Sequence, residues 1–363
     1  VFGPSLKMDK IHFSEFGTHL AFMNSTDTSK IKTFDLGLWS TGDKKATIIV
    51  DHNELDSNLA ASSYRRGYFS LDEKRLFYGI GNRPINEPKD TLLSSEKAKL
   101  DLWSWTDKKL QPQQLKQVKR DKNKSNLHVY HIADKKHITL ENDSIRWSYG
   151  FNKNRSVFGG ATNTKPDENT DSWRMPWPED VYRVNINTGE KELIQSNVKH
   201  SNYFTPSGNF FIWYNAADSN FYSKNISTDS EVNLTKGLEK IFTNDNNGMP
   251  YDAYPIGLLG FEKGNENIYL KSQFDIWKFD PNGKIKPINI TKTGKQDSVQ
   301  FYFQHLRRDS SYLNFDDIMV SSHNYRTHDE YLYKFDGEKI EQVSGGAFKL
   351  YDVEKAKNTE NYL

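Results

Sequence analysis

The sequence predicts an all-β protein, a β-propeller of six or seven four-stranded blades. Three observations support this prediction: a phrase that recurs along the chain, regularly spaced tight turns, and many aromatic residues. Aromatic residues make up 13% of the 363 residues, with 22 Phe, 19 Tyr and 8 Trp. Such side chains favour strands, and they can fill a large core although hydrophobic residues reach only 35%.

The recurring phrase is an aromatic residue, Ser or Thr, two spacers, a Gly or a charged residue, and then an apolar strand. Its clear copies begin at Phe13, Phe69 and Phe204, and weaker copies begin near Tyr149, Leu259 and Tyr302. Each copy has the pattern of two strands joined by a tight turn.

A second hairpin follows several copies of the phrase. Its turns are rich in Gly, Asn and Asp and lie at residues 41–44, 187–190, 281–284 and 336–339. Two hairpins give four antiparallel strands, which make one propeller blade. The copies recur at roughly 45–55 residues, slightly above the usual blade period.

The interval between Phe69 and Tyr149 is longer than the others. Residues 102–105, Leu-Trp-Ser-Trp, predict a strand. Residues 113–124 are rich in Leu, Gln, Lys and Arg, which favour helix. We therefore expect a short helix near 113–124, inserted in a blade, with strand alternation resuming at 127–132.

Charge and composition exclude several classes of partner. Lys and Arg number 49 and Asp and Glu 48, so no net field attracts nucleic acid or anionic lipid. The basic run from Lys116 to Lys124 is predicted to be an exposed helix or loop face rather than a binding patch. No apolar stretch approaches the roughly 18 residues of a membrane span. The chain has no cysteine, which removes disulfides, thiolate metal sites and cysteine nucleophiles.

The sharpest match to a catalytic motif is Trp147-Ser148-Tyr149-Gly150. Serine peptidases of the prolyl oligopeptidase family carry their nucleophile in Gly-Trp-Ser-Tyr-Gly, at a strained turn that leads into a helix. Here Arg146 replaces the first Gly, and the residues that follow predict a turn and a strand. Since Gly-x-Ser-x-Gly does not occur in the chain, we assign no catalytic residue.

The ten histidines and the acidic loops are the candidate metal ligands in the sequence. His128 and His131 are three residues apart on a predicted strand, so they point to opposite faces. Residues 167–171, Asp-x-Asn-x-Asp, resemble the start of a calcium loop, but Ser172 and Pro178 stand where such a loop needs Gly and Glu. We predict no metal site and no cofactor.

Three loops, residues 82–95, 162–178 and 243–250, are candidates for functional contacts. In the second, residues 172–178 hold two Trp, an Arg and two Pro. Such residues dominate binding surfaces, so Trp173, Arg174 and Trp177 are candidate contacts with a peptide or another domain. The alternative is a plug packed over the propeller face.

Residues 102–107, Leu-Trp-Ser-Trp-Thr-Asp, and 110–114, Leu-Gln-Pro-Gln-Gln, carry a family resemblance, and residues 180–185 with their Thr188-Gly189 turn agree with it. The sequence resembles the propeller portion of bacterial prolyl oligopeptidase-type serine peptidases, the group of dipeptidyl-peptidases and acylaminoacyl-peptidases. The resemblance covers most of the chain. It implies that residues 1–363 form a single propeller domain, which need not be complete at either end.

The resemblance also implies a function. In that family a C-terminal α/β-hydrolase domain, absent from this chain, holds Ser, Asp and His in that order. The propeller filters substrates and covers the active site. Some members hold the peptide amino terminus with a Glu pair, but no adjacent Glu pair occurs here. Related phrases occur in large exported enzymes, so a periplasmic or secreted location is implied.

We therefore expect a non-catalytic propeller domain of an exported serine peptidase. It would gate access, contact the peptide substrate and act with a C-terminal hydrolase domain, without a nucleic-acid partner or a membrane span. Two alternatives stay open. One is a stand-alone propeller that binds protein or carbohydrate, and the other is a propeller glycosidase with acidic residues around its channel.

Overall fold

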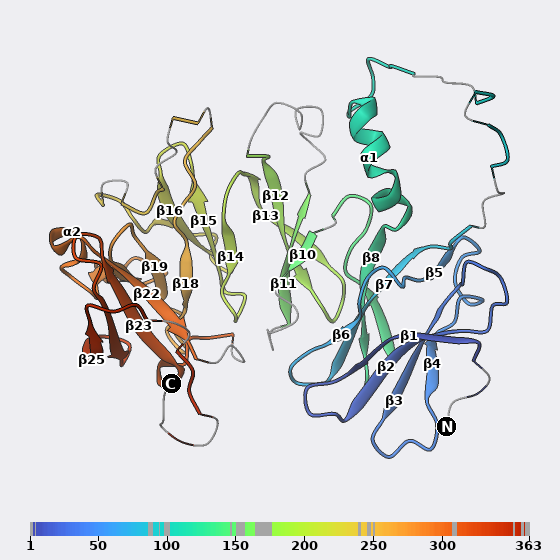
Figure 1. Cartoon of the computed structure of the whole chain (residues 1–363), viewed down its shortest axis with the longest axis horizontal. Coiled ribbons are helices and arrows are strands. Elements are labelled where there is room, and N and C mark those ends of the chain that lie inside the picture. The colour runs from blue at the N-terminus through green and yellow to red at the C-terminus, as the bar shows by residue number, and fades with distance from the viewer. Residues whose placement is uncertain are drawn as a thin grey trace. The chain divides into compact units, whose positions relative to one another are not determined.

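The computed structural model describes residues 3, 5–85, 90–93, 95–97, 102–145, 147–149, 157–163, 176–238, 241–244, 248–249, 251–306, 311–350, 353–356 and 359. Their strands form six antiparallel sheets, five of four strands and one of five (Figure 1). In the four-stranded sheets, strands that follow one another in sequence are neighbours, which is the arrangement of propeller blades. The predicted all-β propeller class is confirmed, with six blades among the described residues.

The chain divides into two compact units. The first comprises Val1–Arg155, Gly159–Trp177 and Tyr182–Glu192, and the second comprises Ser156–Phe158, Pro178–Val181 and Leu193–Leu363. The sequence interpretation of residues 1–363 as a single propeller domain stays a prediction.

The first three sheets follow in chain order. Sheet one contains β1 (Lys7–Phe13), β2 (His19–Ser25), β3 (Asp35–Ser40) and β4 (Thr47–Val50). Sheet two contains β5 (Leu59–Ala61), β6 (Tyr68–Phe69), β7 (Arg75–Asn82), β8 (Ser125–His131) and β9 (Lys136–Thr139). Sheet three contains β10 (Trp147–Tyr149), β11 (Phe158–Asn163), β12 (Glu179–Asn185) and β13 (Lys191–Val198).

The last three sheets repeat the pattern. Sheet four contains β14 (Asn202–Phe204), β15 (Phe210–Asn215), β16 (Asn220–Asn225) and β17 (Glu231–Asn233). Sheet five contains β18 (Leu258–Phe261), β19 (Ile268–Lys271), β20 (Ile276–Phe279) and β21 (Ile288–Asn289). Sheet six contains β22 (Val299–His305), β23 (Ile318–Asn324), β24 (Glu330–Phe335) and β25 (Ile340–Gly346). Two short helices flank β22, α2 (Gly294–Asp297) and a 3₁₀ turn (Phe315–Asp317).

A turn built on Ser or Thr explains the recurring phrase. The backbone N–H of Ser14 donates to the carbonyl of His19 at 3.0 Å, and the Ser14 hydroxyl accepts from the N–H of His19 at 2.9 Å. The same two bonds recur between Ser70 and Arg75 and between Thr205 and Phe210. Each hydroxyl is buried, so it satisfies a strand N–H that has no other partner at the turn.

The second of these turns also reaches the sheet before it. The fourth residue of each of these turns has a positive φ. It is Gly17 (72°) in the first turn and Gly208 (77°) in the third, but Glu73 (55°) in the second. The Glu73 carboxylate accepts hydrogen bonds from the N–H of Phe16, at 2.5 Å, and from the hydroxyl of Thr18. These bonds tie sheet two to the first turn of sheet one and offset the cost of a left-handed non-glycine residue.

The second unit repeats this carboxylate link. Glu266 in the β18–β19 turn also has φ of 55° and is only 5% exposed. Its carboxylate accepts from the N–H of Ser207 at 3.2 Å and from the hydroxyl of Thr205 at 3.3 Å. The hydroxyl of Tyr312 donates to it as well, at 3.1 Å. Sheet five is thus joined to the first turn of sheet four.

Side chains alternate between two packed faces in each unit. In β7, Leu76 and Tyr78 pack with the buried residues of sheet one, whereas Phe77 packs with those of sheet three. In β15, Phe211 packs with β13 residues, while Ile212 packs with residues of sheet five. This period of two is the strand pattern that the sequence predicted, and aromatic rings fill much of the core as expected.

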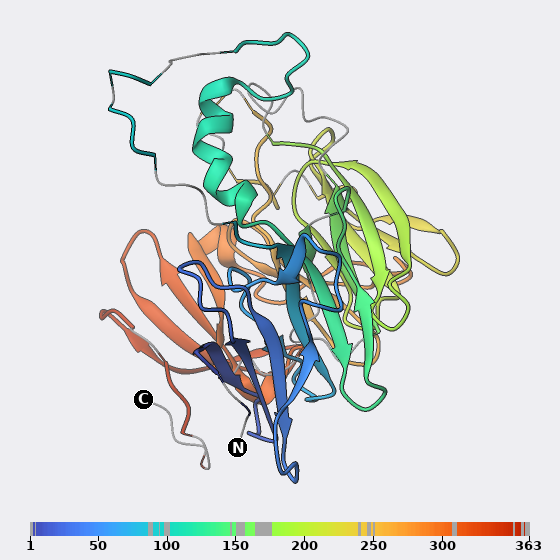
Figure 2. The same ribbon diagram turned by 90° about the vertical axis from the view of Figure 1, so that its right-hand side faces the viewer.

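The predicted helix is present. Helix α1 (Gln111–Lys122) lies within two residues of the predicted 113–124, begins with Pro112 in its first turn and carries basic residues in its last. None of its residues is buried, and it projects beyond the ends of β7 and β8 (Figures 1 and 2). The strand predicted at 102–105 was wrong, since the described residues 102–104 have no regular structure and Trp105 begins a turn.

No helix among the described residues combines the length and apolar character that crossing a membrane requires.

We expect the substitution Glu73→Gln to lower the free energy of unfolding by about 1–3 kcal/mol at neutral pH, because charge-assisted hydrogen bonds to backbone and hydroxyl groups are weakened. Burial raises the pKa of Glu73, but hydrogen bonds from Thr18, Ser14 and Phe16 outweigh it and hold the pKa below its usual 4.5. The contribution of this carboxylate is therefore complete above pH 4.5 and is lost as the pH falls through the folded-state pKa. Urea denaturation at several pH values measures both effects.

The matched control is Glu15→Gln, an exposed glutamate in the neighbouring turn, which should change stability by less than about 0.5 kcal/mol. Equal effects of the two substitutions, or a Glu73→Gln effect that persists undiminished in acid, would contradict the role assigned to Glu73.

Candidate functional site

The serine of the Trp-Ser-Tyr-Gly match lies inside a sheet. Ser148 is the middle residue of β10, where it is paired with Ala161 of β11, and its N–H donates to Glu141 at 3.1 Å. Its Oγ is buried and has no hydrogen-bond partner among the residues that the structure describes. A nucleophilic serine must instead be exposed at a strand-to-helix turn beside a base. The structure therefore agrees with the sequence interpretation of Ser148 as a strand residue.

The histidines of β8 have structural contacts. His128 packs near the ring of Tyr78, with centroids 5.6 Å apart, while Nε2 of His131 lies 2.9 Å from the carbonyl oxygen of Ile186. They are on opposite faces of the strand, as predicted. Burial lowers the pKa of His128, so its ring is neutral at neutral pH.

The predicted contact loop is described only at its end. Trp173 and Arg174 lie outside the described residues, as do the residues of the calcium-like segment 167–171. Trp177 is described, and 48% of it is exposed. The contact role of Trp173, Arg174 and Trp177 stays a prediction.

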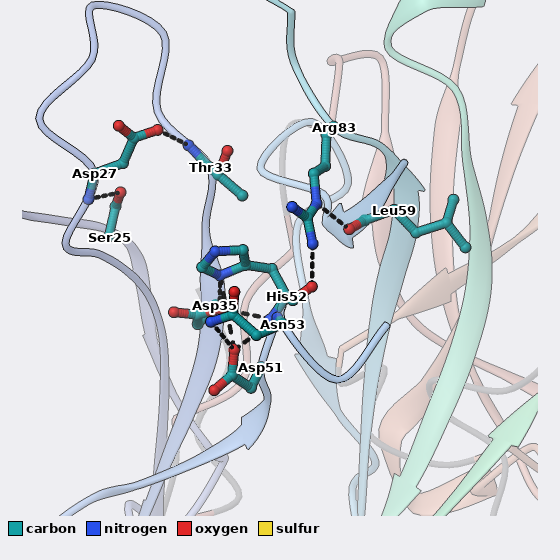
Figure 3. A network of polar contacts seen from close by, with 9 residues as sticks. All are labelled: Ser25, Asp27, Thr33, Asp35, Asp51, His52, Asn53, Leu59 and Arg83. Carbon is teal, nitrogen blue, oxygen red and sulfur yellow. Dashed lines mark hydrogen bonds and ion pairs between the residues drawn. The ribbon is translucent and has the colours of Figure 1, made fainter. Parts of the chain in front are cut away.

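The structure assembles a polar cluster that the sequence interpretation missed, made of Asp35, Asp51 and His52 (Figure 3). Nδ1 of His52 lies 2.6 Å from Oδ1 of Asp35 and 3.8 Å from Oδ1 of Asp51. These three atoms are close enough to share a metal ion. Asp51 and His52 are adjacent in the sequence, but Asp35 precedes them on β3, so only strand pairing brings them together.

Hydrogen bonding in the cluster favours a structural role. Oδ1 of Asp35 accepts both the backbone N–H of His52, at 2.8 Å, and its ring Nδ1–H. That nitrogen would have to give up its proton to bind a metal. Oδ1 of Asp51 accepts from the backbone and side-chain amides of Asn53. Nη2 of Arg83 donates to the His52 carbonyl, so a fixed positive charge stands beside the cluster (Figure 3).

The same position is used in two other sheets. Asp35 and Asn220 begin the third strands of sheets one and four, and Asp275 immediately precedes the third strand of sheet five. The side chain of Asn220 accepts from Thr235 at 2.8 Å, and that of Asp275 accepts from Thr291 at 2.7 Å. Each bond reaches the segment after the fourth strand. The bond between Asp35 and His52 is thus the form that this repeated link takes in sheet one. It joins the start of the third strand to the segment after the fourth strand.

One amine in the second unit has an unusual environment. Nζ of Lys271, at the end of β19, lies 3.2 Å from the centroid of the Tyr302 ring in β22. Burial lowers the pKa of Lys271 to about 8. Its partner in the described part of the chain is an aromatic face rather than a carboxylate, so the neutral amine is accessible near pH 8.

Comparison with known proteins gives only structural likenesses. No family model matches the sequence, and no curated protein sequence matches it. An acylaminoacyl peptidase in complex with Z-Gly-Gly-Phe-chloromethyl ketone is similar, with 13% identity, 93% of this chain and 45% of that chain covered, and a TM-score of 0.37. Dipeptidyl peptidase 4 of Porphyromonas gingivalis has 12% identity, coverages of 92% and 52%, and a TM-score of 0.43.

A third similar structure is the β-propeller domain of the Trilobed protease from Pyrococcus furiosus, with 12% identity, coverages of 93% and 84%, and a TM-score of 0.36. The chain spans about half the length of the first two proteins. Peptidases of the two kinds named by the sequence resemblance are therefore among the similar solved structures. Their TM-scores lie below 0.5, so this likeness assigns no function.

We expect a fluorophosphonate probe to leave Ser148 unlabelled, because its hydroxyl is buried in a paired strand and no described residue acts on it as a base. Mass spectrometry of the treated protein measures this directly, and the substitution Ser148→Ala serves as the blank. Stoichiometric labelling of Ser148 in the folded protein would show that the strand assignment is mistaken.

The structural role of Asp35 predicts a loss of stability in Asp35→Asn of about 1–3 kcal/mol, since the variant weakens bonds from two donors of His52. Asp51→Asn should cost less, because the side chain of Asp51 is 40% exposed and that of Asp35 only 11%. Thermal unfolding with Zn²⁺ or EDTA should give the same midpoint within about 1 °C. A Zn²⁺-dependent rise that disappears in Asp35→Asn would identify a metal site instead.

Proposed function

We propose that this chain is the non-catalytic propeller part of an exported serine peptidase, periplasmic or secreted, which contacts peptide and limits access to a catalytic domain. The sequence resemblance supports this proposal, and so does the burial of Ser148 within β10. The observation that carries it is an exposed apolar insertion between β7 and β8.

This β7–β8 insertion comprises residues 83–124, including α1. Among its described residues, the large apolar side chains that are exposed are Ile85, Leu92, Leu93, Leu102, Trp103, Trp105, Leu110, Leu115 and Val118. Trp105 is 96% exposed and Trp103 65%. Helix α1 buries none of its residues. Large apolar side chains that are exposed along one segment make it a candidate binding segment.

Burying this surface would give a large gain in free energy. Each fully buried large apolar side chain contributes roughly 1.5–3 kcal/mol, and Trp is among the residues that dominate binding surfaces. Trp103 and Trp105 also belong to the segment that carries the family resemblance. We therefore assign the β7–β8 insertion to contact with the catalytic domain, and the loop with Trp173, Arg174 and Trp177 to contact with peptide.

The alternatives have less support from the described residues. A glycosidase needs a pair of carboxylates free to act as acid and base. The buried carboxylates of Glu73, Glu141, Glu266 and Asp275 all accept backbone N–H groups, so they hold the fold. A stand-alone propeller that binds protein could use the same insertion. The two proposals differ in the natural gene product, because that of a stand-alone propeller contains no catalytic domain.

The test uses the natural gene product that contains this chain. We expect that product to include a hydrolase domain, and expect the double substitution Trp103→Ala/Trp105→Ala to lower kcat/KM on short fluorogenic peptides by tenfold or more. The melting temperature should change little, because both side chains are exposed. Tyr64→Ala, which removes another exposed aromatic from the first unit, is the matched control and should leave activity unchanged.

Two outcomes would overturn the proposal. One is a natural product that lacks any hydrolase domain. The other is full peptidase activity in the double variant.

A further inference from the structure

The second unit contains a buried imidazole that the proposed function does not use. His200 lies just before β14, is only 8% exposed, and has both ring nitrogens sealed from solvent. Neither nitrogen has a hydrogen-bond partner among the residues that the structure describes. Buried polar atoms are normally hydrogen-bonded, so this ring is an exception that calls for a physical reason.

Two tyrosine rings enclose the imidazole. The ring of Tyr214 in β15 has its centroid 5.6 Å from that of His200, at an angle of 68°, and the ring of Tyr254 lies 4.8 Å away at 76°. Both are edge-to-face contacts, which aromatic rings favour. Tyr214 is fully buried and its hydroxyl is hydrogen-bonded to that of Thr243, whereas Tyr254 is 41% exposed. His200 therefore lies between a core ring of sheet four and a surface ring.

The surface ring belongs to a hairpin, residues 242–256, whose stem is anchored in the core. The N–H of Ile256 donates to the carbonyl of Phe242, and the N–H of Asn244 donates to that of Tyr254, both at 2.8 Å. Phe242 is buried and packs with core residues of sheets four and five. The inner end of the hairpin is thus held by apolar packing, and Tyr254 lies at its outer end against His200.

The charged groups that face His200 are Asp252, on the hairpin, and Lys199, on its own segment. Their side chains pair at 3.3 Å and are 44% and 33% exposed, so this ion pair stays in contact with water. Burial lowers the pKa of His200 below its usual 6.5, while Asp252 opposes this shift and Lys199 adds to it. The imidazole is therefore neutral at neutral pH.

A second proton would give the imidazole a positive charge and two N–H donors in a site that is sealed from solvent and offers no described acceptor. To hydrate this charge the ring has to move outward, away from Tyr254. We propose that protonation of His200 is an acid-sensitive switch, which releases Tyr254 and the outer part of the 242–256 hairpin from sheet four. The hairpin includes the predicted contact loop 243–250, so acid changes the surface that this loop presents.

The direction and range of the pH effect follow from linkage. When the hairpin is released, the histidine regains its ordinary pKa of about 6.5, whereas in the closed contact its pKa is lower. The closed contact is therefore most stable above pH 6.5 and weakens as the pH falls through the folded-state pKa. At pH 5.5 the equilibrium constant for release should rise by about fivefold to tenfold, because one pKa unit corresponds to a factor of ten.

Amide hydrogen exchange of the whole chain, resolved by residue, tests this proposal. Between pH 7.5 and 5.5 the protection factor of the Asn244 amide should fall about fivefold or more, while that of Leu234, which donates to a carbonyl within sheet four, should not. His200→Phe keeps a ring that cannot be protonated, so it should abolish the pH dependence. His328→Asn is the matched control, because it removes an exposed histidine at a positive φ of 63° that Asn tolerates, and it should keep the pH dependence.

Two further substitutions keep the test decisive if the phenylalanine variant does not fold. Tyr254→Ala removes the ring that His200 holds and, being at the surface, should leave the fold intact but give low Asn244 protection at both pH values. Asp252→Asn should keep the pH dependence, which separates His200 from the ion pair with Lys199.

Equal Asn244 protection at both pH values in the unmodified chain would overturn the proposal. So would a pH dependence that persists in His200→Phe or Tyr254→Ala, or one that disappears in Asp252→Asn. None of these outcomes depends on whether the chain belongs to a peptidase.

Discussion

The carboxylate link between successive first turns is the interaction on which the rest of the architecture depends. The apolar faces of a four-stranded sheet must be buried against a neighbouring element. Apolar packing gives this contact its strength but is not directional. Glu73 and Glu266 fix how neighbouring sheets are oriented. Each has a buried carboxylate that accepts hydrogen bonds from a backbone N–H and a hydroxyl in the turn of the preceding sheet. The left-handed backbone at both residues shows that the chain accepts local strain to keep this contact.

The sequence predicts the repeat because its signals are local. A Ser or Thr five residues before its partner, with a Gly between them, is visible in the chain, and the structure shows the hydroxyl closing each turn. The same holds for the second hairpins and for α1, whose composition favours helix. The strand predicted at 102–105 was wrong because the apolar run Leu-Trp-Ser-Trp was taken as a strand pattern, whereas Trp105 is 96% exposed and begins a turn. Propensity alone cannot tell a strand from an exposed irregular segment.

Long-range contacts could not be predicted in the same way. Asp35 meets His52 only because β3 and β4 pair and return the chain to the start of the third strand. Lys271 meets Tyr302 only after sheets five and six have packed together. In each case the residue types are unremarkable in the sequence, and their chemistry depends on neighbours from other strands. The buried strand position of Ser148, by contrast, followed from Arg146 and the strand pattern after it.

The fold thus uses the buried carboxylates of Glu73 and Glu266 for structure. Amide hydrogen exchange resolved by residue tests this account most directly. The N–H groups of Phe16 and Ser207 lie in turns, and Phe16 is 76% exposed, yet both donate to a carboxylate of the next sheet. The account predicts that both amides exchange far more slowly than free turn amides. Exchange of both at the unprotected rate in the native protein would contradict it.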